Sequence, residues 1–280
     1  MSNLDPEPSE NTAAPVEFGF GQETCLNCGA LHSNKFCSVC GQPAAVKRLR
    51  WSNLIDDIKE RLLGMDGKFL RTFRMALANA GEVSRVYLSG NRVKYVGPVG
   101  LFLICLTLYL IFMELLGVKM SDLVAIGDKL QGGQDFSERQ RAMMEVFYDN
   151  FNQYFRTISF FSTFISGFLI WLLNRWMKLN LVEHMVFPFY TEGLAYLISF
   201  PQLLFVHSDS MVAVSGIVFI VSQGFLIYAY STFDLQGSRL RRILKGFFIR
   251  VLSYIILSLI AVGFAIFWVF RNRELIKGLE

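Results

Sequence analysis

The residues that decide the fold are Tyr95 to Met113, which read YVGPVGLFLICLTLYLIFM and contain no charged side chain. A helix needs about 20 predominantly apolar residues to cross the hydrocarbon core of a bilayer. Pro98 suits the first turn of a helix, where its missing N–H has no intrahelical partner in any case. The stretch therefore predicts a membrane-spanning helix over about 95–116.

Four more apolar runs follow, at about 157–174, 185–206, 211–233 and 251–270, with charged or polar residues at their ends. Apolar residues make up 53% of the 280-residue chain and 27 residues are Phe, which is too apolar for an ordinary soluble domain. We therefore expect an all-α integral membrane helical bundle of about five transmembrane helices. Five spans would leave the tail 271–280 on the side opposite the N-terminus.

Two CxxC pairs, each followed by glycine, stand near the N-terminus: Cys25, Cys28, Cys37 and Cys40. Two such knuckles can turn four thiolates toward one tetrahedral zinc ion, and the glycines tolerate the positive φ that such turns need. Four thiolates leave no open position for water, so the pattern predicts a structural zinc ribbon over 24–43. A redox dithiol pair and an iron centre are the alternatives, and His32 is either a spare ligand or a solvated loop residue.

Residues 1–23 are acidic and contain prolines, and they lack the basic start and apolar segment of a signal peptide. We expect a disordered acidic tail and, because zinc thiolates persist in reducing compartments, a cytoplasmic N-terminus. Basic residues cluster on the flanks that this orientation places in the cytoplasm. They are Arg85, Arg92, Lys94, Arg175, Lys178, Arg239, Arg241, Arg242, Lys245 and Arg250.

Residues 44–94, between the ribbon and the first span, carry two helical patterns with apolar and charged faces. The first covers about 51–62. In the second, Phe69, Leu70, Phe73 and Leu77 share one face beside a basic face. We expect cytosolic juxtamembrane amphipathic helices that lie either in the lipid headgroup layer or against the protein itself. The net charge of +4 makes nucleic acid an unlikely partner.

The segment that leads the chain into the first span reads RVYLSGNRVKYVGP from Arg85 to Pro98. Its tyrosines suit a membrane interface and its basic residues can reach phosphate groups. The segment is interpreted first as a structural motif at the membrane surface. The alternative is a lipid or headgroup site at Arg85, Arg92 and Lys94, which would make membrane lipid a partner.

The third span begins LVEHMVFPFYTE and carries the candidate intramembrane functional residues Glu183, His184 and Glu192. A carboxylate beside an imidazole could relay a proton or bind a metal. Glu192 falls about 12 Å deeper, near the middle of the bilayer, where an ionisable group is costly without a partner or cavity. The alternative is that Glu183 and His184 cap the helix and that Glu192 is protonated and hydrogen-bonded to a neighbouring helix.

Three motifs in combination resemble a bacterial domain-of-unknown-function family of membrane proteins with a zinc-ribbon head. They are CxxC with FCSVCGQ (Phe36–Gln42), YLSGNRVKY leading to Pro98 (from Tyr87), and VEHMVF (Val182–Phe187). The resemblance extends over roughly Cys25 to Arg242. It implies a bacterial inner-membrane protein with several spans and no assigned activity.

The sequence is compatible with two classes of function. GxxxxGK, GxSxG and HExxH signatures are absent from the sequence, so no catalytic residue is assigned. The first class is a non-enzymatic membrane module whose cytosolic zinc ribbon docks a partner protein or its own cytosolic face. The second is a small-solute or proton-coupled transporter, or a lipid-modifying membrane enzyme, that uses Glu183, His184 and Glu192.

Overall fold

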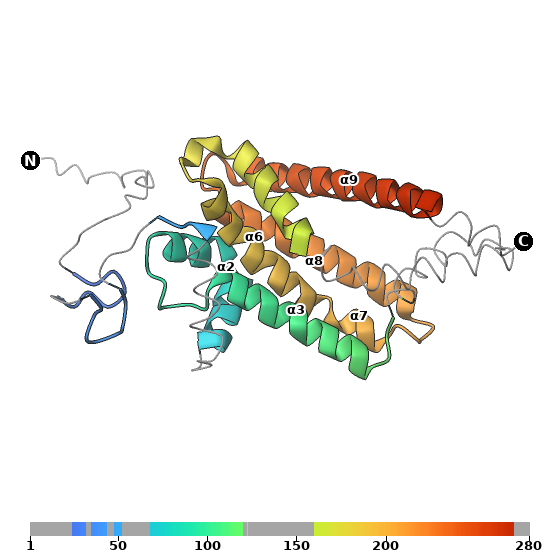
Figure 1. Ribbon diagram of the computed structural model, residues 1–280, viewed down its shortest axis with the longest axis horizontal. Coiled ribbons are helices and arrows are strands. Elements are labelled where there is room, and N and C mark those ends of the chain that lie inside the picture. The colour runs from blue at the N-terminus through green and yellow to red at the C-terminus, as the bar shows by residue number, and fades with distance from the viewer. Residues whose placement is uncertain are drawn as a thin grey trace, which may run out of the picture.

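A computed structural model of the chain describes residues 24–31, 35–43, 48–51, 68–119, 122 and 160–271 (Figure 1). In these residues the regular structure is helical, and extended backbone pairs only in two isolated bridges, Thr24 with Leu31 and Phe36 with Pro43. Both bridges belong to the small cysteine-bearing unit formed by the described part of 24–43, which we call the cysteine head. The predicted all-α class is confirmed.

The bundle is built from one short 3-10 turn and several helices. In chain order these are α2 (Lys68–Leu88), α3 (Pro98–Leu115), the helix Phe160–Leu173, η1 (Arg175–Met177), α6 (Leu181–Ile198), α7 (Phe200–Leu204), α8 (Met211–Phe233) and α9 (Arg239–Arg271). The predicted helix at 51–62 lies outside the described residues except for Trp51. The predicted tails 1–23 and 271–280 also lie outside them, except for Arg271.

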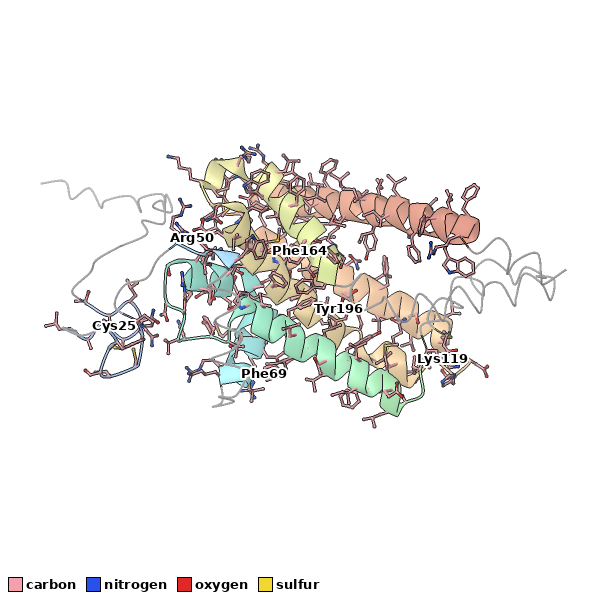
Figure 2. All side chains as sticks on the ribbon, in the orientation of Figure 1. Cys25, Arg50, Phe69, Lys119, Phe164 and Tyr196 are labelled. Atoms are coloured by element: carbon pink, nitrogen blue, oxygen red, sulfur yellow. The ribbon has the colours of Figure 1, made fainter. Side chains whose placement is uncertain are left out.

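The helices run back and forth between two ends of the bundle (Figure 1). Helices α3, α6 and α9 begin, and α8 ends, at the end nearest the cysteine head, which we call the head end. Cys25 lies beyond this end, whereas Lys119 lies at the opposite end (Figure 2). The connections between helices therefore lie at the head end and at the opposite end, about one helix length apart.

Three helices within the described residues are long and apolar enough to cross a membrane: Pro98–Leu115, Met211–Phe233 and Arg239–Trp268. The helix Phe160–Leu173 is apolar but shorter. These helices have the length and composition of a membrane protein, and they correspond to four of the five predicted spans. The last of them begins at Arg239, well before the predicted start at 251, so Arg250 lies inside a helix rather than at its edge.

Helix α6 lies at the centre of the bundle and packs against α2, α3 and α8. A close approach to α3 occurs at Gly193, where an added Cβ would stand 2.9 Å from the Cα of Phe102. Buried aromatic residues fill the surrounding core, including Phe102, Phe189 and Tyr190. Packing on several faces therefore keeps α6 largely away from lipid.

The predicted span over 185–206 corresponds to two helices in the structure. Helix α6 begins earlier, at Leu181, and ends at Ile198, after which a separate short helix, α7, covers Phe200–Leu204. Pro201 occupies the first turn of α7. Pro201 has no N–H to donate to a carbonyl one turn earlier, so it suits the first turn of a new helix.

Helix α2 packs against the protein itself, which decides between the two predicted placements of the second amphipathic pattern. Its buried side includes Thr72, Ala76, Ala80 and Val83, in contact with α6 and α8. Phe69, Phe73 and Leu77 are partly buried against the same core, whereas Leu70 is half-exposed.

The axis of α2 bends at Asn79, whose φ of −156° and ψ of 74° are not helical. The Asn79 side chain accepts a hydrogen bond from the N–H of Glu82 at 3.0 Å and donates one to the Glu82 carboxylate at 3.2 Å. These two bonds cap the second half of α2 as a new helix N-terminus. The bend brings Gly81 against the C-terminal end of α8.

Gly81→Ala tests this close contact. A Cβ at Gly81 would stand 2.2 Å from the carbonyl carbon of Thr232 and 2.4 Å from the backbone nitrogen of Phe233. Because backbone cannot move aside cheaply, we expect a loss of about 1–3 kcal/mol in the free energy of unfolding, measured by denaturation in mixed micelles. Gly216→Ala in α8 is the control, since its Cβ meets nothing within 4 Å. Equal effects of the two substitutions would contradict the contact.

Candidate functional site

The four cysteines of the head converge on one point. Their Sγ atoms all lie within 4.8 Å of one another, with Cys25 to Cys40 and Cys28 to Cys37 at 3.5 Å each. Four thiolates around zinc at about 2.3 Å would be roughly 3.8 Å apart, so the cluster is close to the spacing that a metal requires. The four predicted ligands are thus brought together, while His32 lies outside the described residues.

Each CxxC knuckle is closed by backbone hydrogen bonds. The N–H of Gly29 donates to the carbonyl of Cys25 at 2.9 Å, and that of Gly41 donates to Cys37 at 2.8 Å. The two glycines have φ of +72° and +73°, in the left-handed region that other residues rarely adopt. The glycine after each cysteine pair is therefore a geometric requirement of the knuckle.

The pKa values of Cys28 and Cys40 are shifted in opposite directions. Burial opposes ionisation of Cys40, but hydrogen bonds from the Asn27 side chain and the Gln42 backbone outweigh it and lower its pKa to about 6. At Cys28 the Ala30 backbone favours the thiolate, but the surrounding protein and the three neighbouring thiols raise its pKa to about 12. Four thiolates this close repel one another, and a bound cation removes that repulsion. The donor set therefore fits a soft or borderline divalent metal.

The cysteine head is joined to the bundle through Gln42, whose side chain is 1% exposed. Its Nε2 donates to the carbonyl of Gly90 at 2.8 Å, and its Oε1 accepts from the N–H of Val93 at 3.2 Å. One amide thus satisfies both a donor and an acceptor of the turn between α2 and α3. The last residue of FCSVCGQ binds the middle of the YLSGNRVKY motif.

A second junction lies at the start of α6. Arg48 donates from Nη2 to Glu183 Oε2 at 2.8 Å and from Nε to Oε1 at 3.1 Å, a two-pronged contact with a carboxylate that is 1% exposed. The bond raises the pKa of Arg48. Leu49, next to it, is buried in the core, and its carbonyl accepts a hydrogen bond from the Asn180 side chain at 3.3 Å.

Glu183 also completes the N-terminal cap of α6. Its carboxylate accepts a hydrogen bond from the N–H of Asn180 at 2.7 Å, while the Asn180 side chain accepts from the N–H of Glu183 at 2.8 Å. This reciprocal arrangement is a capping box, which satisfies two N–H groups that a helix start leaves open. His184 is fully buried beside it, with Nδ1 3.0 Å from the Asn180 carbonyl. Both residues lie at the start of α6, and their functional role stays a prediction.

The predicted headgroup residues occupy different environments. Arg85 is partly buried and donates to the carbonyls of Thr232 and Phe233 at the end of α8, and burial lowers its pKa. Arg92 and Lys94 lie over the rings of Tyr87 and Tyr95, with 5.8 and 5.3 Å from the charged group to the ring centre. The three basic groups do not converge on one position, and their role at lipid headgroups stays a prediction.

Glu192 is separate from Glu183 and His184, so the three candidate residues of α6 do not form one site. Its Oε1 accepts hydrogen bonds from Arg250 Nη1 at 2.7 Å and from Ser166 Oγ at 3.2 Å. Arg250 Nε also donates to Gln223 Oε1 at 3.2 Å. The predicted alternative of a hydrogen bond to a neighbouring helix is thus present, with an arginine as the partner.

A buried polar cluster near the head end was not predicted from the sequence. Lys245 Nζ donates to Asp234 Oδ2 at 2.9 Å and to Asn174 Oδ1 at 2.7 Å. The hydroxyl of Tyr230 lies 2.9 Å from Asn174 Nδ2, which donates to it, and 3.3 Å from Asp234 Oδ2. Asp234 and Lys245 are visible in the sequence only as flanking charges, since nothing local indicates that they meet.

Comparison with known proteins gives one match. A family model described as "Protein of unknown function (DUF3667)" matches residues 66–110, which contain α2, the YLSGNRVKY motif and most of α3. The cysteine head and the VEHMVF motif lie outside the matched stretch. No curated protein and no solved structure matches the chain. The chain is therefore similar, over this stretch, to a family whose description names no activity.

The contact between Arg48 and Glu183 can be tested by substitution. Arg48→Ala would leave a buried carboxylate without its cation, and because Arg48 itself is half-exposed we expect a loss of about 1–3 kcal/mol in the free energy of unfolding. Denaturation in mixed micelles provides the measurement. Adding Glu183→Gln should cost less in the Arg48→Ala background than in the native protein. The exposed Arg71→Ala is the control, and an equal effect there would contradict the pairing.

Proposed function

We propose that the chain is a non-enzymatic membrane module whose metal-bound cysteine head docks onto the head end of its own bundle. The observation that carries the proposal is Gln42, which is buried between the carbonyl of Gly90 and the N–H of Val93. The Arg48 contact with Glu183 supports it at a second point. The head then acts as a metal-dependent clasp between the α2–α3 turn and the start of α6.

We infer that the metal is zinc in a structural role. Four cysteine ligands complete a tetrahedral shell and leave no position for a substrate or an activated water. A unit this small has little core of its own: Cys25 and Cys37 are buried, whereas Leu31, Phe36 and Val39 are 60–76% exposed. Metal binding would therefore supply the folding free energy of the head.

The proposed location is a bacterial inner membrane, with the head end in the cytoplasm. Basic side chains lie on the loops and helix starts of the head end: Arg175, Lys178, Arg239, Arg241, Arg242 and Lys245. Such a concentration is typical of the cytoplasmic side of membrane proteins. A reducing compartment also suits free cysteines around a metal.

Docking of a partner protein is the other part of this proposal. Leu31, Phe36 and Val39 project from the head with exposed fractions of 76%, 60% and 71%. Exposed apolar groups on so small a unit favour a protein contact over solvent. These three residues are distinct from Gln42, so one head could bind both the bundle and a partner.

The metal assignment predicts one zinc ion per chain in protein purified without chelator, measured by elemental mass spectrometry. Cys37→Ser should lose most of the bound metal because three thiolates leave the tetrahedral shell incomplete. Cys105→Ser is the matched control, since Cys105 is buried in α3 away from the head. Iron in place of zinc, or equal metal content in the two variants, would contradict the assignment.

Docking itself predicts a coupling between the metal and the α2–α3 turn. Removing the metal with a chelator should increase amide hydrogen exchange over residues 90–95, because Gln42 no longer holds Gly90 and Val93. Gln42→Ala should produce the same increase with the metal still bound. The control is Gln236→Ala, at an exposed position. If exchange over 90–95 does not respond to chelation, the head does not act as a clasp.

A further inference from the structure

The ion pair between Glu192 and Arg250 joins α6 to α9, and the two side chains are partly buried, with exposed fractions of 18% and 17%. Glu192 is about eleven residues beyond the start of α6, Arg250 is about eleven beyond the start of α9, and Gln223 is about ten before the end of α8. At about 1.5 Å per residue, all three lie roughly 16 Å along their helices from the head end. Three helices therefore bring polar groups to one level.

A small cavity of about 20 Å³ adjoins the pair. It is lined by Glu192, Arg250, Ser166, Thr191 and Tyr230, together with apolar groups and Gly246. A water molecule needs about 10–15 Å³ of such space and two or more polar partners, so the cavity suits one water. The cavity therefore has room for one water molecule beside the ion pair.

One oxygen of the carboxylate remains available at this site. The hydrogen bonds from Arg250 and Ser166 both end on Oε1 of Glu192. Oε2 has no hydrogen-bond partner among the described residues. A pair that served packing alone would gain by using both oxygens, as the two-pronged contact of Arg48 with Glu183 does.

The cavity has a polar connection to the head end. Tyr230 lines the cavity, and its hydroxyl belongs to the Asn174, Asp234 and Lys245 cluster. The Lys245 side chain is 25% exposed, so that cluster reaches solvent. Tyr230 thus stands between the solvent-connected cluster and the water-sized space beside Glu192.

Other titratable groups around α6 are distinct from the cavity. Arg250, with the Tyr254 ring 5.2 Å from its guanidinium, faces Glu192 from α9, and Tyr230 faces the cavity from α8. The helix Phe160–Leu173 contributes the hydroxyl of Ser166. Other buried titratable groups nearby include Glu183, His184 and Tyr190 of α6, Asp234 after α8, Tyr87 of α2, and Cys105 and Tyr109 of α3, and none of these lines the cavity.

We propose that Glu192 is a proton-binding site inside the membrane, reached from the head end past Tyr230, with Arg250 as its counter-ion. A hydronium ion in the cavity transfers a proton to Oε2, leaving a neutral carboxylic acid and a water molecule; loss of the proton reverses the step. Arg250 keeps Gln223 and the Tyr254 ring as partners when the carboxylate is neutralised. This proposal is independent of the metal-dependent clasp.

Infrared difference spectroscopy of the metal-loaded, full-length protein in lipid nanodiscs tests the site. On acidification from about pH 8 to pH 5 we expect a carboxylic acid C=O band that is lost in Glu192→Gln and shifted in Glu192→Asp. Glu114→Gln, at the exposed far end of α3, is the matched control and should retain the band. A purely structural ion pair stays ionised throughout, so identical spectra for the native protein and Glu192→Gln would overturn the proposal.

The route is tested separately by the rate at which the band appears after a rapid pH change. Tyr230→Ala enlarges the passage and should speed the band severalfold, whereas Tyr230→Phe keeps the ring and should change the rate less. Native-like circular dichroism of each variant confirms that it is folded. An unchanged rate in a folded Tyr230→Ala variant would overturn the route through the head end.

Discussion

The burial of α6 on several sides is the constraint on which the rest of the structure depends. A helix that packs against α2, α3 and α8 cannot leave its polar side chains in solvent or lipid. Each of its two carboxylates is accordingly paired with an arginine from a distant part of the chain, Glu183 with Arg48 and Glu192 with Arg250. The contacts that pair the carboxylates of α6 therefore also hold Arg48, which follows the cysteine head, and α9 against α6.

The two ion pairs differ in a way that separates their roles. The Glu183 carboxylate uses both oxygens, with two bonds from Arg48 and a third from the helix cap. The Glu192 carboxylate uses one oxygen and borders a water-sized cavity. Saturated hydrogen bonding suits a permanent junction, whereas a carboxylate oxygen with no partner among the described residues, beside a water-sized cavity, suits a group that changes its protonation. One helix thus carries a fixed contact at its start and a reactive candidate halfway along.

The metal cluster and the bundle are connected by few but buried contacts. The Gln42 side chain bonds the carbonyl of Gly90 and the N–H of Val93 in the turn between α2 and α3, and Leu49 is buried in the main core. A head of this size gains little from apolar burial, so its position depends on these specific polar bonds. This explains how a small thiolate unit with exposed apolar tips can still have a defined place at the end of a membrane bundle.

Sequence alone determined the features that depend on local spacing. Apolar runs long enough for a membrane, two CxxC knuckles with their glycines, and Pro98 at the start of α3 were all correctly predicted, because hydrophobic length and ligand spacing are set by neighbours in the chain. Pro201 is itself a local signal for a helix start, but the apolar run that contains it was predicted as one helix. Tertiary structure alone decided which polar groups meet. Gln42 binds Gly90 across 48 residues, Arg48 binds Glu183 across 135, and Arg250 binds Glu192 across 58. Such pairs follow from the rotation and depth of packed helices, and those are set by core contacts between segments that carry no mark of each other in the sequence.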